Sequence, residues 1–224
     1  MKVLGHCANT PRWVHIYLRE GAHGVELDVY NRGGEIVVGH KLPDDRPRLL
    51  RERFSSLLTS LHITRSTRLS RMLSILPDRS LVMLDLKTPV DPSALVQEVE
   101  TAGLEVGKVV VSTRYHDLAG DLSKAGFITL LSIDHRPSDP ILLIRRSGAH
   151  GISVRWSYAD PYVVDALTKE GFSVALWTVN AKESLEKALR TRADFLITDY
   201  PARALKFLAL LSSGEGKQGV TLNL

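Results

Sequence analysis

The sequence alternates short apolar runs with amphipathic stretches of helical length, and this alternation restricts the fold more than any other feature. Eight runs rich in Val, Leu and Ile cover residues 3–6, 24–29, 81–87, 108–113, 128–133, 151–155, 173–179 and 194–199. Amphipathic patterns lie between them at 93–102, 115–125, 161–170 and 183–190. Glycines that can stop a helix follow most of the helical stretches, namely Gly21, Gly103, Gly126, Gly148 and Gly171. Strands that alternate with helices form βαβ units and a parallel sheet.

Eight such units predict a closed (β/α)8 TIM barrel, an α/β fold, over residues 1–211. An open doubly wound sheet is the alternative, but no glycine-rich phosphate loop follows the first run. After the second strand, the turn sequence Asn31-Arg32-Gly33-Gly34 predicts a short strand over 35–40 that folds back. Residues 212–224 are rich in Gly and polar residues and predict a flexible C-terminal tail.

The composition indicates a soluble globular protein, since 44% of the residues are hydrophobic and 24% are charged, with a net charge of +4. Cys7 is the only cysteine, which excludes an internal disulfide. No signal-peptide pattern and no membrane-spanning window is found, so we expect a cytoplasmic protein without stable membrane insertion. No zinc spacing or RNA-binding motif accompanies the basic pI, so no nucleic-acid partner is expected. The scarcity of Asn, Gln and Cys favours a thermophilic source.

Three carboxylates stand where a TIM barrel carries its chemistry, at the carboxyl ends of strands. Glu26 and Asp28 are two residues apart on one strand and therefore share a face, and Asp85 ends the next predicted barrel strand. Converging carboxylates repel one another unless a proton or a cation lies between them. Hard oxygen ligands suit Mg²⁺ or Ca²⁺ rather than zinc. The alternatives are a structural ion pair or a solvated sheet face, and a parallel barrel weakens the latter because both of its faces are covered.

Lys87 and two histidines complete the candidate site. Lys87 shares a face with Asp85, where it could neutralise that carboxylate or contact a phosphate oxygen. His6 and His40 each end a short run, and imidazole suits acid–base chemistry near neutral pH. A single histidine at a strand end is more often structural, but two that flank a carboxylate cluster favour catalysis. The other six histidines are expected at the surface.

Six markers in order along the chain resemble the glycerophosphodiester phosphodiesterase family, a TIM-barrel group that also includes the sphingomyelinase D (phospholipase D) toxins. The markers are His6, Glu26-Leu27-Asp28, the Gly33-Gly34 turn with Val37-Val38-Gly39-His40, Asp85-Leu86-Lys87, Trp177-Thr178-Val179-Asn180 and Thr198-Asp199-Tyr200-Pro201. Together they extend over nearly the whole chain. No single marker is specific, whereas the ordered set is.

The resemblance implies a metal-dependent hydrolase of glycerophosphodiesters that produces glycerol phosphate and an alcohol. His6 and His40 resemble the catalytic acid–base pair, and Glu26, Asp28 and Asp85 resemble the ligands of one Mg²⁺ or Ca²⁺ ion. Two further residues resemble substrate-binding groups, Lys87 at the phosphate and Trp177 as an aromatic wall of the pocket. The implied reaction is attack by a substrate hydroxyl, passage through a cyclic phosphate, and hydrolysis by water. The implied partner is a small phosphodiester or a lipid-derived substrate.

The chain departs from the family pattern at several positions. The bacterial enzymes have Arg where this chain has Cys7, Glu where it has Asp85, and Asp where it has Lys41, and their Pro-Glu-Asn motif is missing after His6. The first two departures match the toxin branch, although a single cysteine allows no toxin disulfide. Arg12, Arg114 and Arg155 are candidates to replace the missing arginine. The alternatives are therefore phospholipase D-type headgroup cleavage or a weakly catalytic barrel that binds phosphorylated ligands.

Overall fold

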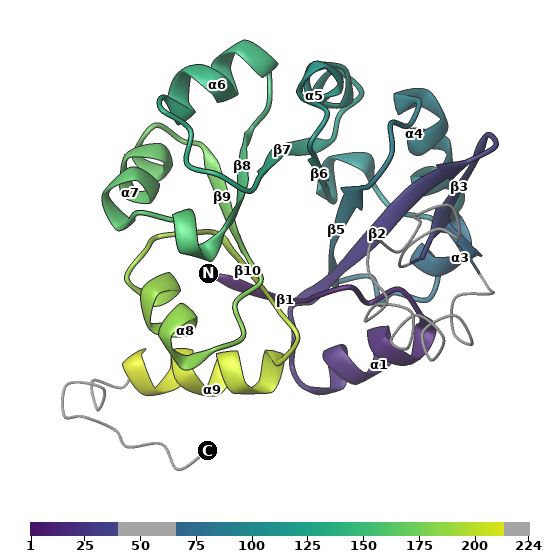
Figure 1. Ribbon diagram of the computed structural model, residues 1–224. Helices are drawn as coiled ribbons and strands as arrows, with labels where there is room; N and C mark the ends of the chain where they lie inside the picture. Colours follow the sequence, from purple (N-terminus) through teal and green to yellow (C-terminus); the bar gives the residue numbers. More distant parts are fainter. Residues whose placement is uncertain (40–65, 213–224) are drawn as a thin grey trace, which may run out of the picture.

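The computed structural model describes residues 1–39 and 66–212 (Figure 1). His40, Lys41 and the tail after residue 212 lie outside these described residues. Within them, ten strands form one sheet, and eight of these are parallel and close into a barrel through the pairing of β1 with β2. The barrel strands are β1 (Lys2–Gly5), β2 (Gly24–Arg32), β5 (Leu81–Leu86), β6 (Val109–Thr113), β7 (Ile128–Ile133), β8 (Gly151–Arg155), β9 (Ser173–Trp177) and β10 (Phe195–Thr198). Each predicted apolar run coincides with one of them, so the predicted TIM barrel is confirmed.

Helices surround the barrel on its outer side (Figure 1). They are α1 (Pro11–Arg19), α3 (Leu69–Leu73), α4 (Pro92–Thr101), α5 (His116–Lys124), α6 (Pro140–Ser147), α7 (Pro161–Lys169), α8 (Lys182–Leu189) and α9 (Pro201–Ser212), with 3-10 turns η1 (Val106–Lys108) and η2 (Trp156–Tyr158). All five predicted helix-stop glycines have a positive φ. No helix in the described part of the chain is long and apolar enough to span a membrane.

Four helices begin with the same local sequence, a side-chain cap followed by proline. Thr10, Asp91, Asp139 and Asp160 each accept a hydrogen bond from a backbone N–H in the first turn of α1, α4, α6 and α7. Proline comes next in each case, where its fixed φ suits a helix and its missing N–H costs no hydrogen bond. These caps fix where each strand-to-helix loop ends, and those loops form the mouth of the barrel.

The predicted fold-back strand is present as β3 (Glu35–Val38), which pairs antiparallel with the end of β2. Gly33 and Gly34, both with positive φ, form the turn between them. A two-residue turn with positive φ at both positions matches the twist of a hairpin. β4 (Thr67–Arg68) then pairs with β3, so the hairpin extends the sheet beyond the barrel. The hairpin also brings Gly39 back to the carboxyl end of β2, where its N–H donates to the Asp28 carbonyl oxygen at 3.1 Å.

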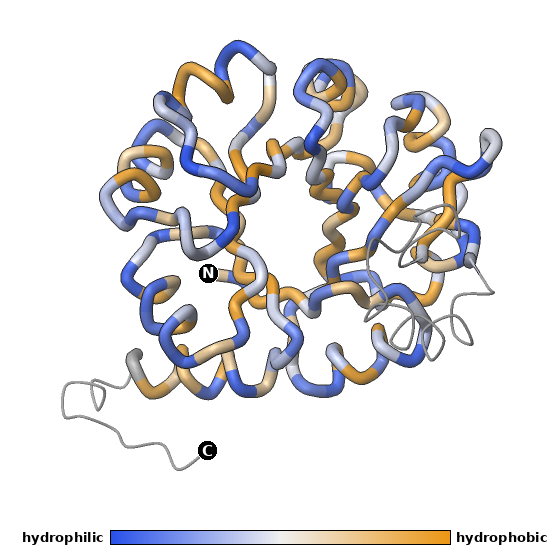
Figure 2. The backbone as a smooth tube through the Cα atoms, in the orientation of Figure 1, coloured by the Kyte–Doolittle hydropathy of each residue, from blue (hydrophilic) through white to orange (hydrophobic). Residues whose placement is uncertain are grey.

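Strand residues alternate between the barrel interior and the layer beneath the helices. The interior cluster contains Leu4, Met83, Val110, Leu130, Ala175 and Ile197, and two larger clusters lie between the strands and the helices. Hydrophobic colouring accordingly follows the strands, whereas the outer sides of the helices are largely hydrophilic (Figure 2). Because Met83 faces inward, Asp85 two residues later also faces inward, at the end of the barrel that holds the polar residues.

Close strand contact at Gly151 gives a test of this packing. A Cβ added there would lie 1.8 Å from the carbonyl oxygen of Ser173 on β9, an approach that backbone atoms cannot relieve locally. We expect Gly151→Ala to lower the free energy of unfolding by about 3 kcal/mol, at the upper end of overpacking costs. Urea denaturation measures the loss. The control is Gly107→Ala, where the nearest atom would lie at 3.9 Å, and equal stability of the two variants would contradict this packing.

Candidate active site

The three predicted carboxylates meet at the mouth of the barrel. Asp28 on β2 lies directly opposite Asp85 on β5 in the strand register, and Glu26 lies one inward-facing position below Asp28. Ligand atoms of the three side chains lie within 4.8 Å of one another. Glu26 is 4% exposed and Asp28 is 1% exposed, so their charges are largely removed from water. The register of the parallel pair, together with the two-residue period of β2, produces this convergence.

Lys87 neutralises part of this charge. Its Nζ lies 2.8 Å from Oδ1 of Asp28 and also contacts Asp85. The surrounding carboxylates raise the pKa of Lys87 above its usual value, although burial acts in the opposite direction. Burial, followed by the charges of Asp28 and Asp85, raises the pKa of Glu26 to about 8. One ammonium among three carboxylates leaves an excess of negative charge.

This donor set fits a divalent cation. Three carboxylates with converging oxygens are the ligands that Mg²⁺ and Ca²⁺ prefer, and a cation would relieve the repulsion that raises the pKa of Glu26. Lys87 contacts Asp28 and Asp85, two of the three carboxylates that a metal ion would use. A cation and Lys87 would therefore compete for these carboxylates.

Asn9 fixes Asp28 and was not identified from the sequence. Its Nδ2 donates to Asp28 Oδ2 at 2.7 Å, and its Oδ1 accepts the backbone N–H of Asp28 at 2.8 Å. These two bonds join the loop after β1 to β2 and set the orientation of the carboxylate. An asparagine in a loop has no sequence signal for such a role, because the pairing depends on the path of the loop over the barrel.

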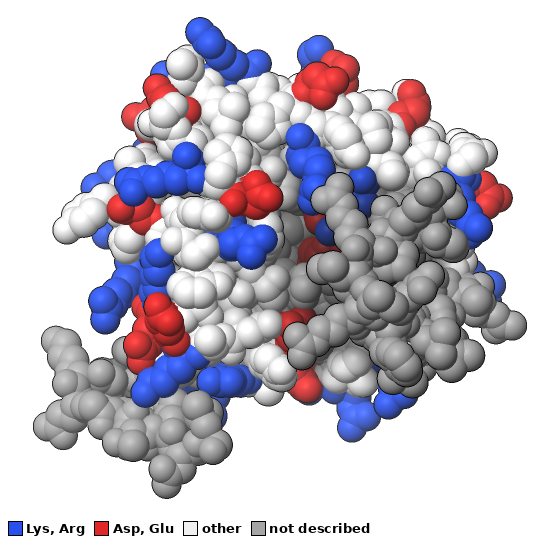
Figure 3. Space-filling model, viewed as in Figure 1, with Lys and Arg blue, Asp and Glu red and all other residues white. Residues whose placement is uncertain are grey.

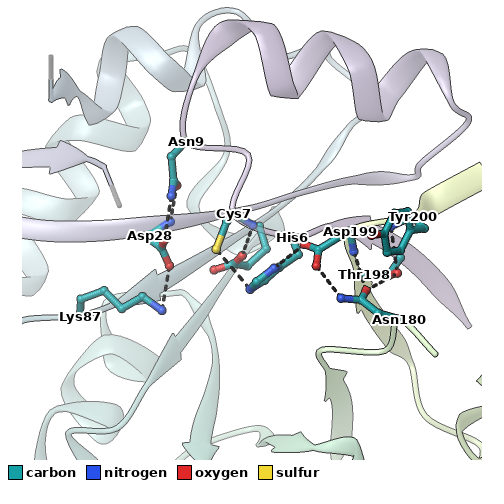
Figure 4. Close-up of polar contacts among 10 residues, drawn as sticks. His6, Cys7, Asn9, Asp28, Lys87, Asn180, Thr198, Asp199 and Tyr200 are labelled. Atoms are coloured by element: carbon teal, nitrogen blue, oxygen red, sulfur yellow. Dashed lines mark hydrogen bonds and ion pairs between the residues drawn. The ribbon is translucent and has the colours of Figure 1, made fainter. Parts of the chain in front are cut away.

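His6 follows β1 and is held by a carboxylate from the far end of the chain. Its Nδ1 lies 2.7 Å from Oδ1 of Asp199, which follows β10 (Figure 4). Asn180 donates to Asp199 through Nδ2, and its Oδ1 accepts the Asp199 backbone N–H at 2.9 Å. Burial alone would lower the pKa of His6, but Asp199 and the nearby carboxylates outweigh it, so the pKa is raised. The hydrogen bond from His6 in turn lowers the pKa of Asp199.

Asp199 therefore controls the protonation of His6, and this gives a second prediction. We expect Asp199→Asn to lower the pKa of His6, because the substitution removes both the strongest hydrogen-bond acceptor and a neighbouring negative charge. The imidazole pKa can be followed by NMR, with the His6 resonance assigned from its loss in a His6 variant. Asp121→Asn, in an exposed pair with Lys124, is the control and should leave the His6 pKa unchanged. If the His6 pKa were unchanged in Asp199→Asn, the proposed effect of Asp199 on the protonation of His6 would be refuted.

Cys7 lies between the histidine and the carboxylates in a backbone conformation that L-residues rarely adopt, with φ 49°. Its N–H donates to Oε2 of Glu26 at 2.7 Å, and its Sγ lies 3.2 Å from Nε2 of His6. Burial, followed by the charges of Glu26 and Asp28, raises the pKa of the thiol. The thiol is therefore part of the site, at the position where the resemblance leads one to expect an arginine.

The opposite wall of the cavity consists of residues from β6, β7, β8 and β9. The cavity has a volume of about 140 Å³, and its lining includes Ser112, Arg114, Ser132, Ser153 and Trp177 together with His6, Glu26, Asp85 and Lys87. The indole Nε1 of Trp177 is buried without a hydrogen-bond partner among the described residues. Sequence analysis identified Trp177 but not the three serines, which no motif marks.

Of the three candidate arginines, Arg114 lines the cavity, whereas Arg155 lies over the Trp177 ring with its Cζ 5.0 Å from the centroid. Arg12 is exposed on α1 and does not line the cavity. Around the mouth, outside the part drawn in grey, basic and acidic side chains alternate instead of forming a patch of one sign (Figure 3). Arg114 is therefore the cation best placed to replace the missing arginine.

Two histidines at other positions accept hydrogen bonds from backbone N–H groups near the amino-terminal ends of strands. His23 Nδ1 accepts the N–H of Val3 at 3.0 Å, and His150 Nδ1 accepts that of Thr129 at 3.1 Å. Burial and the charge of Lys2 lower the pKa of His23, so it stays a neutral acceptor. Both were expected at the surface: His150 is exposed, as expected, whereas His23 is half-buried.

The sequence matches no protein-family model and no curated protein sequence. Solved structures are similar in fold. A glycerophosphodiester phosphodiesterase from Parabacteroides distasonis has TM-score 0.74 and 18% identity, covering 94% of this chain and 98% of the other. A glycerophosphodiester phosphodiesterase from Thermotoga maritima has TM-score 0.68 and 23% identity, covering 92% and 98%. An Oleispira antarctica phosphodiesterase in complex with the product sn-glycerol-3-phosphate has TM-score 0.73 and 18% identity, covering 93% and 97%. These similarities establish the fold, and the TIM barrel implied by the resemblance is confirmed.

Proposed function

We propose that this chain is a metal-dependent phosphodiesterase that hydrolyses glycerophosphodiesters to glycerol phosphate and an alcohol. The observation that carries the proposal is the convergence of His6, Lys87 and the three carboxylates at one mouth of the barrel. The similarity in fold to glycerophosphodiester phosphodiesterases, one of them in complex with sn-glycerol-3-phosphate, supports the same reaction class.

His6 is suited to move a proton at the reacting phosphodiester. Asp199 binds Nδ1, so the neutral ring keeps its proton on Nδ1 and presents Nε2 to the cavity. In the proposed reaction, a substrate hydroxyl attacks phosphorus while one base takes its proton, and the departing alcohol oxygen receives a proton as its bond to phosphorus breaks. The product of this step is a cyclic phosphate, which water then opens with the acid and base roles exchanged.

His40 is the proposed second acid–base group, on the resemblance alone, because it lies outside the described residues. Its chain neighbour Gly39 is within them and is bound to the Asp28 carbonyl oxygen.

Glu26, Asp28 and Asp85 are the proposed ligands of one divalent cation, Mg²⁺ or Ca²⁺. When bound, such an ion polarises phosphoryl oxygens and offsets their developing negative charge. Lys87 and Arg114 supply fixed positive charge along the cavity wall for the same oxygens. Asn9 keeps Asp28 oriented throughout, because it bonds both the carboxylate and the backbone of that residue.

The cavity wall favours a polar, water-soluble substrate. Ser112, Ser132 and Ser153 line it with hydroxyl groups that can bond an alcohol or a glycerol moiety. The Trp177 side chain also lines this wall and offers an aromatic surface to the substrate.

Phosphorus NMR of glycerophosphocholine and lysophosphatidylcholine, each incubated with the protein and Mg²⁺ or Ca²⁺, tests the proposal. We expect glycerol phosphate or its cyclic form from the first substrate. Headgroup loss from lysophosphatidylcholine alone would instead favour phospholipase D-type cleavage. Binding without turnover of either substrate would identify a phosphate-binding barrel. His6→Ala serves as the control for activity from a contaminating enzyme.

A further inference from the structure

Cys7 has no role in the proposed hydrolysis, yet its thiol lies beside His6 and its N–H bonds Glu26, two residues that line the cavity. Sγ of Cys7, Nε2 of His6 and a carboxylate oxygen of Glu26 all lie within 4.8 Å of one another. Figure 4 shows the thiol and the imidazole pointing toward each other, with Asp199 on the far side of the ring. Thiolate, imidazole and carboxylate together form a donor set typical of zinc, in contrast to the all-oxygen set of Glu26, Asp28 and Asp85.

The separations suit a tetrahedral zinc-type ion. Bond lengths of about 2.1 Å to nitrogen and 2.3 Å to sulfur at a tetrahedral angle place these two donors about 3.6 Å apart. The observed separation between Nε2 of His6 and Sγ of Cys7 is 3.2 Å. Only small side-chain movements are therefore needed to bind an ion between them.

The residues that bond to these donor side chains also favour a metal site. Asp199 bonds Nδ1 of His6 at 2.7 Å, the carboxylate–histidine arrangement that orients an imidazole toward a metal and strengthens it as a ligand. The Cys7 N–H bonds Oε2 of Glu26 at 2.7 Å and holds that carboxylate beside the thiol. Cys7 has a φ of 49°, a conformation that most residues avoid, and its Sγ lies 3.2 Å from Nε2 of His6.

We propose that His6, Cys7 and Glu26 form a second metal site that binds Zn²⁺ or a similar borderline-soft ion such as Co²⁺. Binding forms three ligand bonds and releases to solvent the thiol proton of Cys7 and any proton carried by the Glu26 carboxyl group, and a water molecule takes the fourth position. The site shares Glu26 with the Glu26–Asp28–Asp85 set, so the two sites compete for that carboxylate. Binding also removes Nε2 of His6 from proton transfer. If the chain has the proposed function, a consequence of this second site is that zinc inhibits hydrolysis.

Direct metal binding tests the site without any measurement of activity. Co²⁺ added to the apo protein should produce a thiolate-to-cobalt charge-transfer band in the near ultraviolet, and Cys7 is the only cysteine that can give it. Cys7→Ser and Cys7→Ala should both lose the band. Asp85→Asn is the matched control: it removes a ligand of the oxygen-only set and should retain the band. Absence of the band in the folded wild-type protein would overturn the proposal.

Zinc affinity gives a quantitative second measurement. Competition with a chromogenic chelator measures the zinc affinity. We expect Cys7→Ser, which removes a ligand, to weaken zinc binding more than 100-fold. We expect Asp199→Asn, which removes only the group that orients His6, to weaken it by roughly 10–100-fold, the loss typical of such supporting residues. Equal zinc affinities of the wild type and Cys7→Ser would refute the role of the thiol. The hydrolysis rate of each variant is then measured with and without zinc. If cobalt and zinc bind as expected but no substrate is hydrolysed, the proposed function fails and the metal site stands.

Discussion

His6→Ala is expected to lower kcat for glycerophosphodiester hydrolysis by at least 100-fold, the usual scale for loss of a general acid or base. The substitution removes the only described imidazole that lines the cavity, and it leaves Asn180 as the side-chain partner of the Asp199 carboxylate. Steady-state kinetics with glycerophosphocholine measures the effect on kcat and KM separately. Because proton transfer occurs in the transition state, kcat should fall much more than KM changes.

His135→Ala is the control for this prediction, since His135 is exposed and lies far along the chain from the carboxylates. It should retain nearly full activity. A comparable fall in both variants would mean that loss of any imidazole destabilises the enzyme. A rise in KM with kcat unchanged in His6→Ala would assign His6 to substrate binding rather than to proton transfer.

Asp28→Asn is expected to lower kcat/KM by about 100-fold or more, because the metal site and the anchor for Lys87 both lose a charge. A metal ion contributes several kcal/mol to stabilisation of a phosphoryl transition state, and each 1.36 kcal/mol corresponds to a factor of ten. Asn at this position keeps the volume and can still accept from Asn9, so we expect the Tm to stay within a few degrees. Chelator should abolish the wild-type activity, and Mg²⁺ or Ca²⁺ should restore it.

Asp121→Asn, which removes an exposed carboxylate from α5, is the matched control and should be neutral. Full wild-type activity in excess chelator would contradict the metal assignment even if Asp28→Asn is inactive. In that case the carboxylate would act by orienting Lys87, whose Nζ lies 2.8 Å from Asp28.

The order and type of the secondary structure follow from local patterns. Apolar runs of four to seven residues between amphipathic stretches leave few folds other than a parallel barrel, and the positive φ of the five helix-stop glycines is a local property of the backbone. The two-residue period of a strand was likewise sufficient to place Glu26 and Asp28 on one face. Their approach to Asp85 followed once adjacent parallel strands were assumed.

The hydrogen-bond partners of the site residues could be identified only from the closed barrel. Asp199 is 193 positions from His6, and closure of β1 against β10 brings the two together. Asn9 reaches Asp28 because the loop after β1 turns over β2, a path that depends on packing instead of on local sequence. The sequence determined which residues end strands, since periodicity and turn residues act over a few positions. Only the tertiary structure decided that Cys7 faces His6 and Glu26, because rotamers and contacts between strands depend on how distant segments pack.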